Sequence, residues 1–401
     1  MATDTPPVEL RTVLREWGRI GCIGFGGPPT HIKLLRELCV ERRGWISAEE
    51  FEDAIAACNL LPGPASTQMA IFCGWRVRRR AGALVGGLAF IVPGLIATIA
   101  LSALFLAGAP PLWVVGAGAG AGAAVAAVAL HAGWDLLTAS WKRRRHVLRW
   151  SLYLLAGGVA TATIGPWLVL VLLGCGVIEL LLARPARPAR SASRARTDAG
   201  RGSPGAVPLL GLVPLVVRTT GLGTLGALAW VAVKVGLLSY GGGFVIIPLM
   251  QADAVGHYHW MSSAQFLNAV VIGQITPGPV VHTTAAVGYA AAGVAGGLLA
   301  AAIAFSPSFA FVLLGAGHFD RLRGDGRARA FLDGAGPAAI GAILGSAVPL
   351  ARALSEGWQF GVLAAAVVAT VVLRRGVVVT LLAAGVVGLV VALAGGPVPH
   401  A

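Results

Sequence analysis

Short glycine- and proline-rich segments are the parts of this chain that could bind a ligand through their backbone. The first half contains two of them, Phe25-Gly26-Gly27-Pro28 and Pro62-Gly63-Pro64. Glycine permits positive φ and close backbone approach, and proline suits the first turn of a following helix, where its missing N–H costs nothing. Each segment therefore predicts the end of one half-helix and the start of another, whose N-terminus favours an anion.

Both segments recur 215 positions later, as Tyr240-Gly241-Gly242-Gly243 and Pro277-Gly278-Pro279. Trp45 and Trp260, Ser47 and Ser262, Phe51 and Phe266, and Gly82 and Gly297 share the same offset. A constant offset indicates a duplication, and two copies of a membrane unit that each contain two breaks are typical of transporters. We expect the four tips to meet near the midplane and form one site for a tetrahedral dianion.

Two cations also share the offset. Arg19 and Lys234 each lie six residues before the aromatic residue of a tip. Lys234 interrupts the otherwise apolar segment Leu225–Leu238, and a charge inside a membrane is expensive enough to suggest a function. One or both cations are expected to neutralise the dianion or to gate its access. The alternative is that their side chains snorkel to the headgroups.

Further polar residues flank the tips. Asn59 and Gln274 precede each Pro-Gly-Pro by three residues, where an amide could donate to an oxyanion or cap the tip backbone. His31 and His282 could carry a proton, or could be hydrogen-bonded without one. The expected substrate-binding residues are Arg19, Phe25, Gly26, Gly27, Pro28, Asn59, Pro62, Gly63, Pro64, Ser66, Thr67, Gln68, Lys234, Tyr240, Gly241, Gly242, Gly243, Gln274, Thr276, Pro277, Gly278, Pro279, His282 and Thr283, with Gln68 and Thr283 in matched positions.

Composition predicts an all-α integral membrane protein. Of the 401 residues, 56% are hydrophobic and 12% are charged, against about a quarter charged in soluble proteins. Residues 81–107, 150–178 and 376–399 carry no charge and are long enough to span a bilayer. The start, Met1–Val8, lacks the pattern of a cleavable signal peptide. The net charge of +14 lies in short clusters between apolar runs, which indicates cytoplasmic loops rather than nucleic-acid binding.

The chain divides into homologous halves, residues 1–183 and 207–401, joined by a basic linker at 184–206. The linker is expected to be a disordered cytoplasmic loop, with weak contact to anionic headgroups as an alternative. Arg76, Arg78, Arg79 and Arg80 make one loop basic, whereas residues 291–295 have no charge; residues 318–329 are basic, whereas Ala107–Trp113 is not. If basic loops are cytoplasmic, the halves have inverted topology.

The first part of each half contains helices too short to span a bilayer. Leu10–Ile23, Pro29–Val40, Phe51–Leu61 and Ala65–Trp75 are each at most about 20 Å long. They predict two re-entrant hairpins per half, followed by about four transmembrane helices; long kinked helices are the alternative. A turn at membrane depth must be buried in protein or line a cavity.

No catalytic motif is present. The sequence lacks a nucleophile elbow, a phosphate-binding loop and paired metal ligands, and its five cysteines have no metal-binding spacing. We therefore expect no enzyme activity, no metal, no cofactor and no nucleotide-driven pump.

At these motifs the sequence resembles the chromate ion transporter family. The matching residues are Phe25-Gly26-Gly27-Pro28, Trp45, Phe51 and Pro62-Gly63-Pro64, and their counterparts in the second half. The resemblance implies chromate efflux across the bacterial inner membrane, chromate resistance, sulfate as an analogue and proton coupling. Tyr240 and Gly243 depart from the family pattern, which leaves substrate preference open. The alternatives are a transporter of sulfate or another oxyanion, a passive anion channel, and a membrane-embedded enzyme or lipid-handling protein. A homodimer is an open option.

Overall fold

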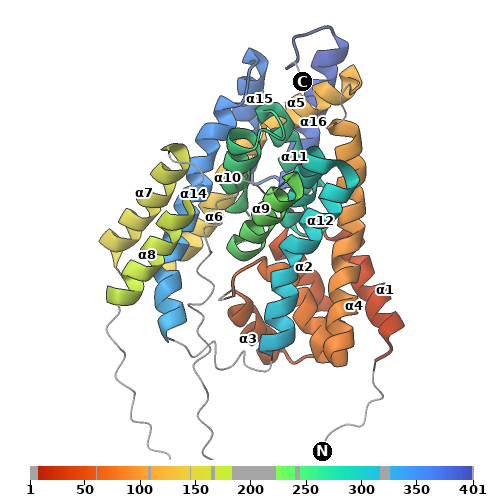
Figure 1. Cartoon of the computed structure of the whole chain (residues 1–401), viewed down its shortest axis with the longest axis vertical. Coiled ribbons are helices and arrows are strands. Elements are labelled where there is room, and N and C mark those ends of the chain that lie inside the picture. Colours follow the sequence, from red (N-terminus) through yellow and green to blue (C-terminus); the bar gives the residue numbers. More distant parts are fainter. Residues whose placement is uncertain are drawn as a thin grey trace, which may run out of the picture.

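The computed structural model describes residues 8–59, 61–106, 110–144, 146–163, 168–182, 223–239, 244–316 and 326–399. Within these ranges every regular element is a helix (Figure 1). Four helical segments are long and apolar enough to cross a membrane: Ala65–Phe105, Leu112–Lys142, Val280–Gly315 and Gly326–Arg352. The expected all-α, multi-pass membrane protein is therefore confirmed. The linker at 184–206 and the tip at 240–243 lie outside the described residues.

The first half begins with short helices that break at the predicted tips. Helix α1 (Leu10–Ile23) is followed by α2 (Pro28–Arg36), which continues as the π-helical turn η1 (Glu37–Arg42). Helix α3 (Ala48–Cys58) then precedes α4 (Ala65–Phe105). Ser47 caps α3 by accepting a hydrogen bond from the Glu50 N–H at 3.2 Å, which is a preferred role for serine at this position.

The second half repeats this order. Helix α9 (Thr224–Leu238) precedes α10 (Ile246–Gln251) and the π-helical turn η4 (Ala252–His257), which lies 215 positions after η1. Helix α11 (Ser263–Ile275) is capped by Ser262, the counterpart of Ser47. The 3-10 turn η5 (Val280–His282) then leads into α12 (Thr283–Gly315). The duplication thus extends to the secondary structure.

Helices α4 and α12 are each a tight hairpin of two arms. The backbone leaves helical geometry at Arg78 and Arg79 in α4 and at Ala292 and Gly293 in α12. A Cβ added at Gly74 would overlap the backbone of Gly82, and one added at Gly288 would lie 2.5 Å from the Gly296 carbonyl. Residues eight apart in a straight helix would lie about 12 Å apart, so the chain must reverse between them.

These glycine pairs show that, from the Pro-Gly-Pro segment to the hairpin turn, the second half is one residue shorter than the first. Gly74 and Gly82 correspond to Gly288 and Gly296, an offset of 214 rather than 215. Gly82 therefore matches Gly296 and not Gly297. The second half has one residue fewer between Pro-Gly-Pro and the hairpin turn, where the 3-10 turn η5 begins the arm. The tighter turn holds fewer residues than a turn of α-helix.

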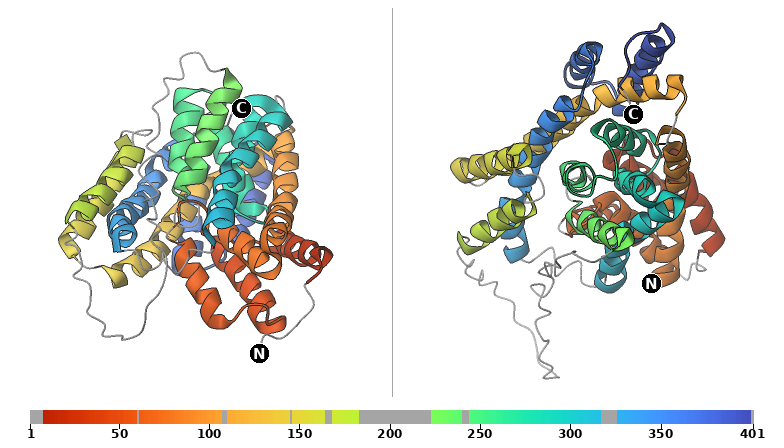
Figure 2. Two further views of the ribbon diagram at one scale, coloured as in Figure 1. Left: turned by 60° about the horizontal axis from the view of Figure 1, so that its bottom comes forward. Right: turned by 45° about the horizontal axis from the view of Figure 1, so that its top comes forward.

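The remaining helices pack across the two halves. The first half ends with α5 (Leu112–Ala123), α6 (Val125–Arg143), α7 (Val147–Thr163) and α8 (Leu168–Leu182). The second ends with α14 (Gly326–Arg352), α15 (Gly357–Val367), the π-helical turn η7 (Val368–Val372) and α16 (Val377–Leu393). Helix α14 packs against α7 and α8, whereas α16 packs against α5 (Figure 2).

Glycines make this exchange possible. The backbones of α7 and α14 meet at Gly157, Gly158, Gly341 and Gly345, and those of α5 and α16 meet at Gly116, Gly120 and Gly388. Small residues let membrane helices approach closely enough to gain packing energy that the lipid does not otherwise supply. The last helices of each half therefore pack mainly against the last helices of the other half.

Candidate functional site

The tips pair across the two halves. The tip Gly24–Pro28 of the first half contacts the tip Thr276–Pro279 of the second, and the Gly278 N–H donates to the Gly24 carbonyl at 2.9 Å. We call this contact junction I. It joins the break between α1 and α2 to the break between α11 and η5.

A second contact exchanges the roles of the two halves: its Pro-Gly-Pro tip comes from the first half, and its broken helix comes from the second. A Cβ added at Gly63 in the tip Pro62–Pro64 would lie 3.2 Å from the Gly236 carbonyl at the end of α9 and 3.2 Å from Ser308 Oγ in α12. We call this contact junction II. Gly21 and Gly236, at the same offset, pack their helices in the same way, against backbone carbonyls of Phe90 and Ala304.

Both junctions lie within the middle third of the long arms. A Cβ at Gly94 would overlap the Pro277 carbonyl of junction I. Gly94 follows Arg80, the start of the long arm of α4, by about 21 Å of helix, and the whole arm to Phe105 is about 39 Å long. Ser308 of junction II follows Val294, the start of the long arm of α12, by the same distance. In a hydrocarbon layer of about 30 Å, both junctions are near the middle.

Buried polar atoms without a hydrogen-bond partner gather at these junctions. Among the described residues, ten such side-chain atoms occur, and eight belong to the junctions or to the helices that begin or end beside them. They are His31 Nδ1, Thr67 Oγ1, Gln68 Oε1, Ser239 Oγ, Gln274 Nε2, His282 Nδ1, His282 Nε2 and Ser308 Oγ. Because most buried polar groups in native proteins are paired, a cluster of unpaired ones needs a functional explanation.

Junction I is lined by two histidines, one from each half. His31 Nε2 is 2.9 Å from the Gly24 carbonyl, so this nitrogen carries the proton and donates it. His282 lies against Gly278 and Gly94. Both rings are fully buried, and each meets a phenylalanine at its edge: His31 meets Phe90 at 5.0 Å, and His282 meets Phe305 at 5.4 Å between ring centroids.

Junction I also contains a buried hydroxyl pair. Thr98 Oγ1 and Thr276 Oγ1 are 3.2 Å apart, and Thr276 donates to the Ile272 carbonyl at 2.8 Å. Thr276 was expected at the site, whereas Thr98 was not. Thr98 lies in an apolar segment, and its polarity is the one sequence signal that could have identified it.

Junction II is lined by an amide and hydroxyls. Gln68 Nε2 donates to the Pro62 carbonyl at 2.7 Å, and the same nitrogen would lie 2.9 Å from a Cβ at Gly63, whereas Gln68 Oε1 has no partner. Gln68 therefore lies against its tip glycine as His282 does in junction I. The sequence analysis paired Gln68 with Thr283. Because the second half is one residue shorter after its Pro-Gly-Pro, the structural counterpart of Gln68 is His282. Thr283 instead donates to the Val280 carbonyl at 2.8 Å.

The two aligned cations have different surroundings. Lys234 Nζ is 2.5 Å from Asp253 Oδ2, and both side chains are largely buried. Lys234 also lies 5.7 Å from the centre of the Trp230 ring. Arg19 is exposed on α1 and makes no ion pair with any residue the structure describes. Sequence reasoning missed Asp253, whose counterpart in the first half is Leu38, so the repeat gave no signal for an acid.

The other expected residues occupy mixed positions. Ser66, Thr67 and Gln274 are buried, whereas Asn59 is exposed at the end of α3 and Phe25 is 44% exposed. Ser239 and Ser308 were not expected at the site. Tyr240, Gly241, Gly242 and Gly243 lie outside the described residues.

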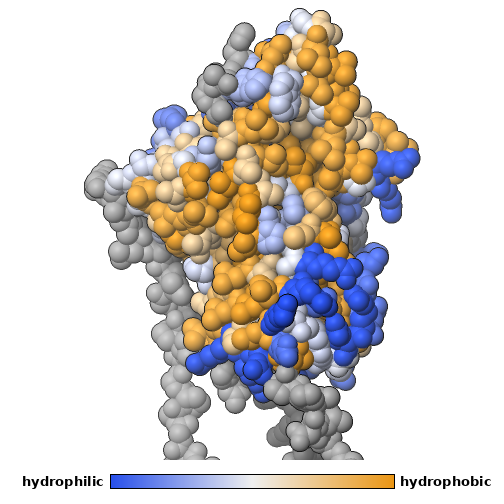
Figure 3. Space-filling model, turned by 90° about the vertical axis from the view of Figure 1, so that its right-hand side faces the viewer, coloured by the Kyte–Doolittle hydropathy of each residue, from blue (hydrophilic) through white to orange (hydrophobic). Residues whose placement is uncertain are grey.

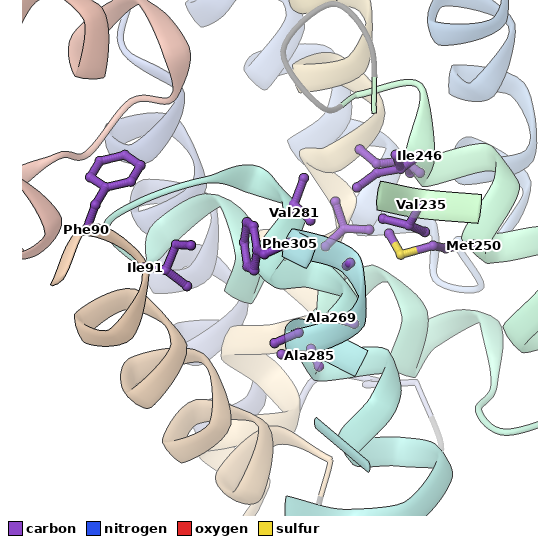
Figure 4. Close-up of a cluster of buried hydrophobic side chains, with 14 of the residues drawn as sticks. Phe90, Ile91, Val235, Ile246, Met250, Ala269, Val281, Ala285 and Phe305 are labelled. Atoms are coloured by element: carbon purple, nitrogen blue, oxygen red, sulfur yellow. The ribbon is translucent and has the colours of Figure 1, made fainter. Parts of the chain in front are cut away.

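Apolar side chains fill the space around the junctions (Figure 4). Phe90 and Ile91 of α4 lie on one side, Val235, Ile246 and Met250 on the other, and Phe305 and Val281 between them. Low-polarity surroundings would strengthen any hydrogen bond that the junctions make to a ligand, because water would not compete for it.

A separate cavity of about 40 Å³ lies among α5, α11 and α15, with Asn268 and Gln359 in its wall. Two of its polar side chains, Gln359 and Gln265, already have structural roles. Gln359 Nε2 donates to the Ala119 carbonyl, and its Oε1 accepts from the Ser355 and Glu356 N–H groups. Gln265 completes the cap of α11 with Ser262. The junctions are therefore the stronger candidate site.

Comparison with known proteins identifies the family. The family described as Chromate transporter matches residues 11–180 and 226–389. The chromate transport protein of Cupriavidus metallidurans is 30% identical over 349 residues, which cover 86% of this chain and 84% of the relative. That of Pseudomonas aeruginosa is 30% identical over 359 residues, which cover 88% and 83%.

A probable chromate transport protein of Synechococcus elongatus is 29% identical over 351 residues, which cover 86% of each chain. No solved structure matches this chain. The two matched segments contain the hairpins and both junctions, and the family is one of membrane transporters rather than enzymes. This chain is a member of the chromate transporter family.

Proposed function

We propose that this protein exports chromate across the bacterial inner membrane, coupled to a proton gradient, and thereby confers chromate resistance. The unpaired polar atoms at the two junctions carry the proposal. They come from both halves, lie near the middle of the long arms, and include hydroxyl and amide groups that can donate to a tetrahedral oxyanion.

The junctions suggest how access could alternate. Each one is a contact between a tip of one half and a broken helix of the other, so a movement of one half against the other must change both contacts. Transport by rocking of repeats around a site at the midplane is a known property of folds with inverted repeats. We propose that substrate binds between the junctions as they part, with Thr67, Ser308 and Gln274 as donors.

The histidine pair is the proposed proton carrier. His31 and His282 are the two titratable groups at junction I, and histidine can gain or lose a proton at physiological pH. Because they come from different halves, protonation of both rings places two like charges across the junction. This repulsion favours parting of the tips and attracts a dianion, which links proton binding to substrate binding.

Inverted topology is part of the proposal, with residues 1–183 and 207–401 as the two repeats and 184–206 as a cytoplasmic linker. Its support is the contrast between the hairpin turns: Arg78, Arg79 and Arg80 make one basic, whereas Gly293 lies in a turn without charge. Helix α3 is at the bottom of Figure 1, and its counterpart α11 is near the top.

Labelling of single cysteines tests this topology. Arg80 and Val294 are exposed, matched residues that follow the two turns. With an impermeant thiol reagent, Arg80→Cys and Val294→Cys should label from opposite sides of sealed vesicles, in a background in which native Cys22 is serine. Labelling from the same side would refute the inverted repeat.

Transport is tested with radiolabelled chromate in proteoliposomes, with an imposed pH gradient and sulfate as competitor. Uphill chromate movement that stops when the gradient is dissipated would establish proton-coupled transport. Movement only down the chromate gradient would make the protein a passive channel, and stronger transport of sulfate would change the substrate.

A further inference from the structure

The beginning of α11 differs in charge from the beginning of its counterpart α3. All four acids of α3 are replaced in α11 by uncharged residues, at the offset of 215. The pairs are Glu49 and Ala264, Glu50 and Gln265, Glu52 and Leu267, and Asp53 and Asn268.

The cations that pair with these acids are replaced as well. In the first half, Arg36 pairs with Glu52, and Arg76 pairs with Glu50. The matched positions of the second half are Gln251 and Ala290. The end of the second half at which α11 begins has therefore lost both signs of charge together, whereas the first half keeps them as ion pairs.

The two ends of the molecule differ in polarity accordingly. Helix α3 is at the bottom of Figure 1, and α11 is near the top. Figure 3 shows the strongest hydrophilic colour over the lower part of one face, whereas the upper end of that face is mostly hydrophobic or pale. An anion that leaves or enters beside α11 thus meets little fixed charge of its own sign.

The uncharged replacements all line the cavity among α5, α11 and α15. Ala264, Gln265, Leu267 and Asn268 are the residues that α11 contributes to its wall, and none of the described lining residues is charged. Helix α5 makes room for them with Gly118, where a Cβ would lie 2.6 Å from Asn268 Oδ1. The cavity of about 40 Å³ has room for about three water molecules, or for one small ion with a few oxygens.

Asn268 is the polar side chain of this wall that has no structural role. Gln265 and Gln359 are bonded in helix caps, whereas Asn268 makes no hydrogen bond with any residue that the structure describes. Its amide nitrogen can donate two hydrogen bonds, whereas the carboxylate of Asp53 at the matched position can only accept them. The exchange of acid for amide thus turns a group that repels an anion into one that can bind it.

The cavity lies on the same two helices as junction I. Asn268 precedes Thr276 by eight residues, or about 12 Å of α11. On α4, Ser102 lies one turn beyond Thr98, is fully buried, and donates to the Thr98 carbonyl at 2.7 Å. Phe105, three residues further on, is in the wall of the cavity. A polar row thus leads from junction I toward the cavity.

The matching positions of α12 are apolar. Val312 and Ala316 replace Thr98 and Ser102 at the offset of 214. Helix α12 therefore has no such row beyond junction II. The hydroxyl groups of α4 are specific to the side of the molecule that holds the uncharged cavity.

We propose that the cavity beside Asn268 is an outer binding site for the transported oxyanion, between junction I and the surface at which α11 begins. Asn268 donates hydrogen bonds to the ion. Because the described wall has no cation, the ion is held weakly and can leave, as conduction requires of a site on a transport route. The identity of the ligand, a tetrahedral dianion, rests on the proposed function.

Protection from thiol labelling tests binding at this site without measuring transport. Ala264→Cys places a thiol in the wall, in a background in which native Cys22 is serine; the other native cysteines are buried. The full chain in proteoliposomes is treated with an impermeant reagent from the side that labels Val294→Cys. Sulfate is the probe, because chromate oxidises thiols. At a sulfate concentration of about twice its Kd, labelling should slow about threefold relative to chloride of equal ionic strength.

Asn268→Asp, introduced beside Ala264→Cys, tests the role of the amide. It keeps the size of the side chain and restores the residue that α3 has, Asp53. The carboxylate is ionised at pH 7, repels a dianion and offers no donor, so the sulfate concentration for half protection should rise at least about tenfold. Asn268→Ala removes the donor without adding charge and should raise it less, by about fivefold.

Val294→Asp is the matched control for the added charge. Val294 is 52% exposed at the same end of the molecule and lies outside the cavity wall. Combined with Ala264→Cys, it should leave the sulfate concentration for half protection unchanged. Equal labelling rates without sulfate would show that the wall is intact in each variant.

Three outcomes would overturn the proposal: no protection by sulfate, equal slowing at Val294→Cys, or protection that Asn268→Asp leaves unchanged. Chromate flux by the same proteoliposomes tests the proposed function separately. Protection without any flux would refute transport and support the site as an anion site, whereas normal flux without protection would refute the site alone.

Discussion

Junctions I and II have the same backbone plan and different side chains. In each, a Pro-Gly-Pro tip of one half lies against the broken end of a helix from the other half. His31, His282, Gly94 and Thr98 of junction I are replaced in junction II by Ile246, Gln68, Ser308 and Val312, respectively. Junction I can therefore change its charge, whereas junction II offers only neutral hydrogen-bonding groups.

In the proposed mechanism, this difference gives the two junctions different roles. The backbone contacts would be needed at both junctions, because the two halves would part and close at both. A titratable pair would be needed at only one junction to link that movement to protons. Substitutions that make the junctions more or less alike test this comparison.

The largest effect is expected at the tip glycines. Gly63 has φ of +113° and Gly278 has φ of +96°, where any Cβ is strained, and both have neighbours close enough to clash. Gly63→Ala and Gly278→Ala should each abolish chromate flux, since backbone strain of ~1–2 kcal/mol adds to a clash with atoms that cannot move without opening the junction. Flux in proteoliposomes is the measurement.

Gly44 is the matched control for these variants. It also has positive φ, at +60°, but a Cβ there would meet nothing within 4 Å. Gly44→Ala should lower stability slightly and leave flux intact. Normal flux in both tip variants would show that close backbone approach at the junctions is unimportant.

The next largest effect is expected at the Lys234–Asp253 pair. Lys234→Ala leaves a buried carboxylate unpaired, which costs about 3–5 kcal/mol, and should abolish chromate resistance. The double variant Lys234→Ala/Asp253→Asn removes both charges. Rescue of resistance by the second change would assign Lys234 a structural role, whereas continued loss at normal membrane levels would support neutralisation of the substrate.

Exchange of the titratable group should give a selective effect. His282→Gln makes junction I resemble junction II, because Gln68 occupies the equivalent place. Uphill flux driven by a pH gradient should fall at least about tenfold, while flux down the chromate gradient should continue. Retention of uphill transport would exclude His282 as a proton carrier; Gln68→His, its mirror image, should leave coupling intact.

The smallest effect is expected at Thr98. Thr98→Val copies Val312 and removes one hydroxyl of the buried pair, while Thr276 keeps its bond to the Ile272 carbonyl. Loss of a single neutral hydrogen bond corresponds to about 1 kcal/mol, so flux should change no more than about fivefold. A complete loss of flux would place Thr98 in direct contact with the substrate.

Local patterns in the sequence predicted the breaks well. Helix α1 has the expected bounds, and the turns at Gly24–Gly27 and Pro62–Pro64 are where proline and glycine placed them. Such breaks depend on residues close in sequence, so their positions can be inferred without the fold. Whether the halves are inverted in the membrane stays a prediction.

Contacts between distant residues could not be inferred in the same way. The pairing of Gly24 with Gly278, and of Gly63 with Gly236, depends on how the halves dock. Asp253 contacts Lys234, and Ser308 lies beside Gly63. In each case no local sequence pattern links the two residues. The one-residue shortening after Pro277-Gly278-Pro279 also changed the counterpart of Gln68, because a constant offset hides a small deletion.

The exchange of helices between halves has a consequence for biosynthesis. Helices α7 and α8 find their main packing surface on α14, which is synthesised more than 150 residues after α7. The first half must therefore wait in the bilayer with the glycine-lined face of α7 uncovered until the second half is inserted. A chain cut within residues 184–206 should still assemble from two co-expressed pieces, while the first piece alone should be degraded.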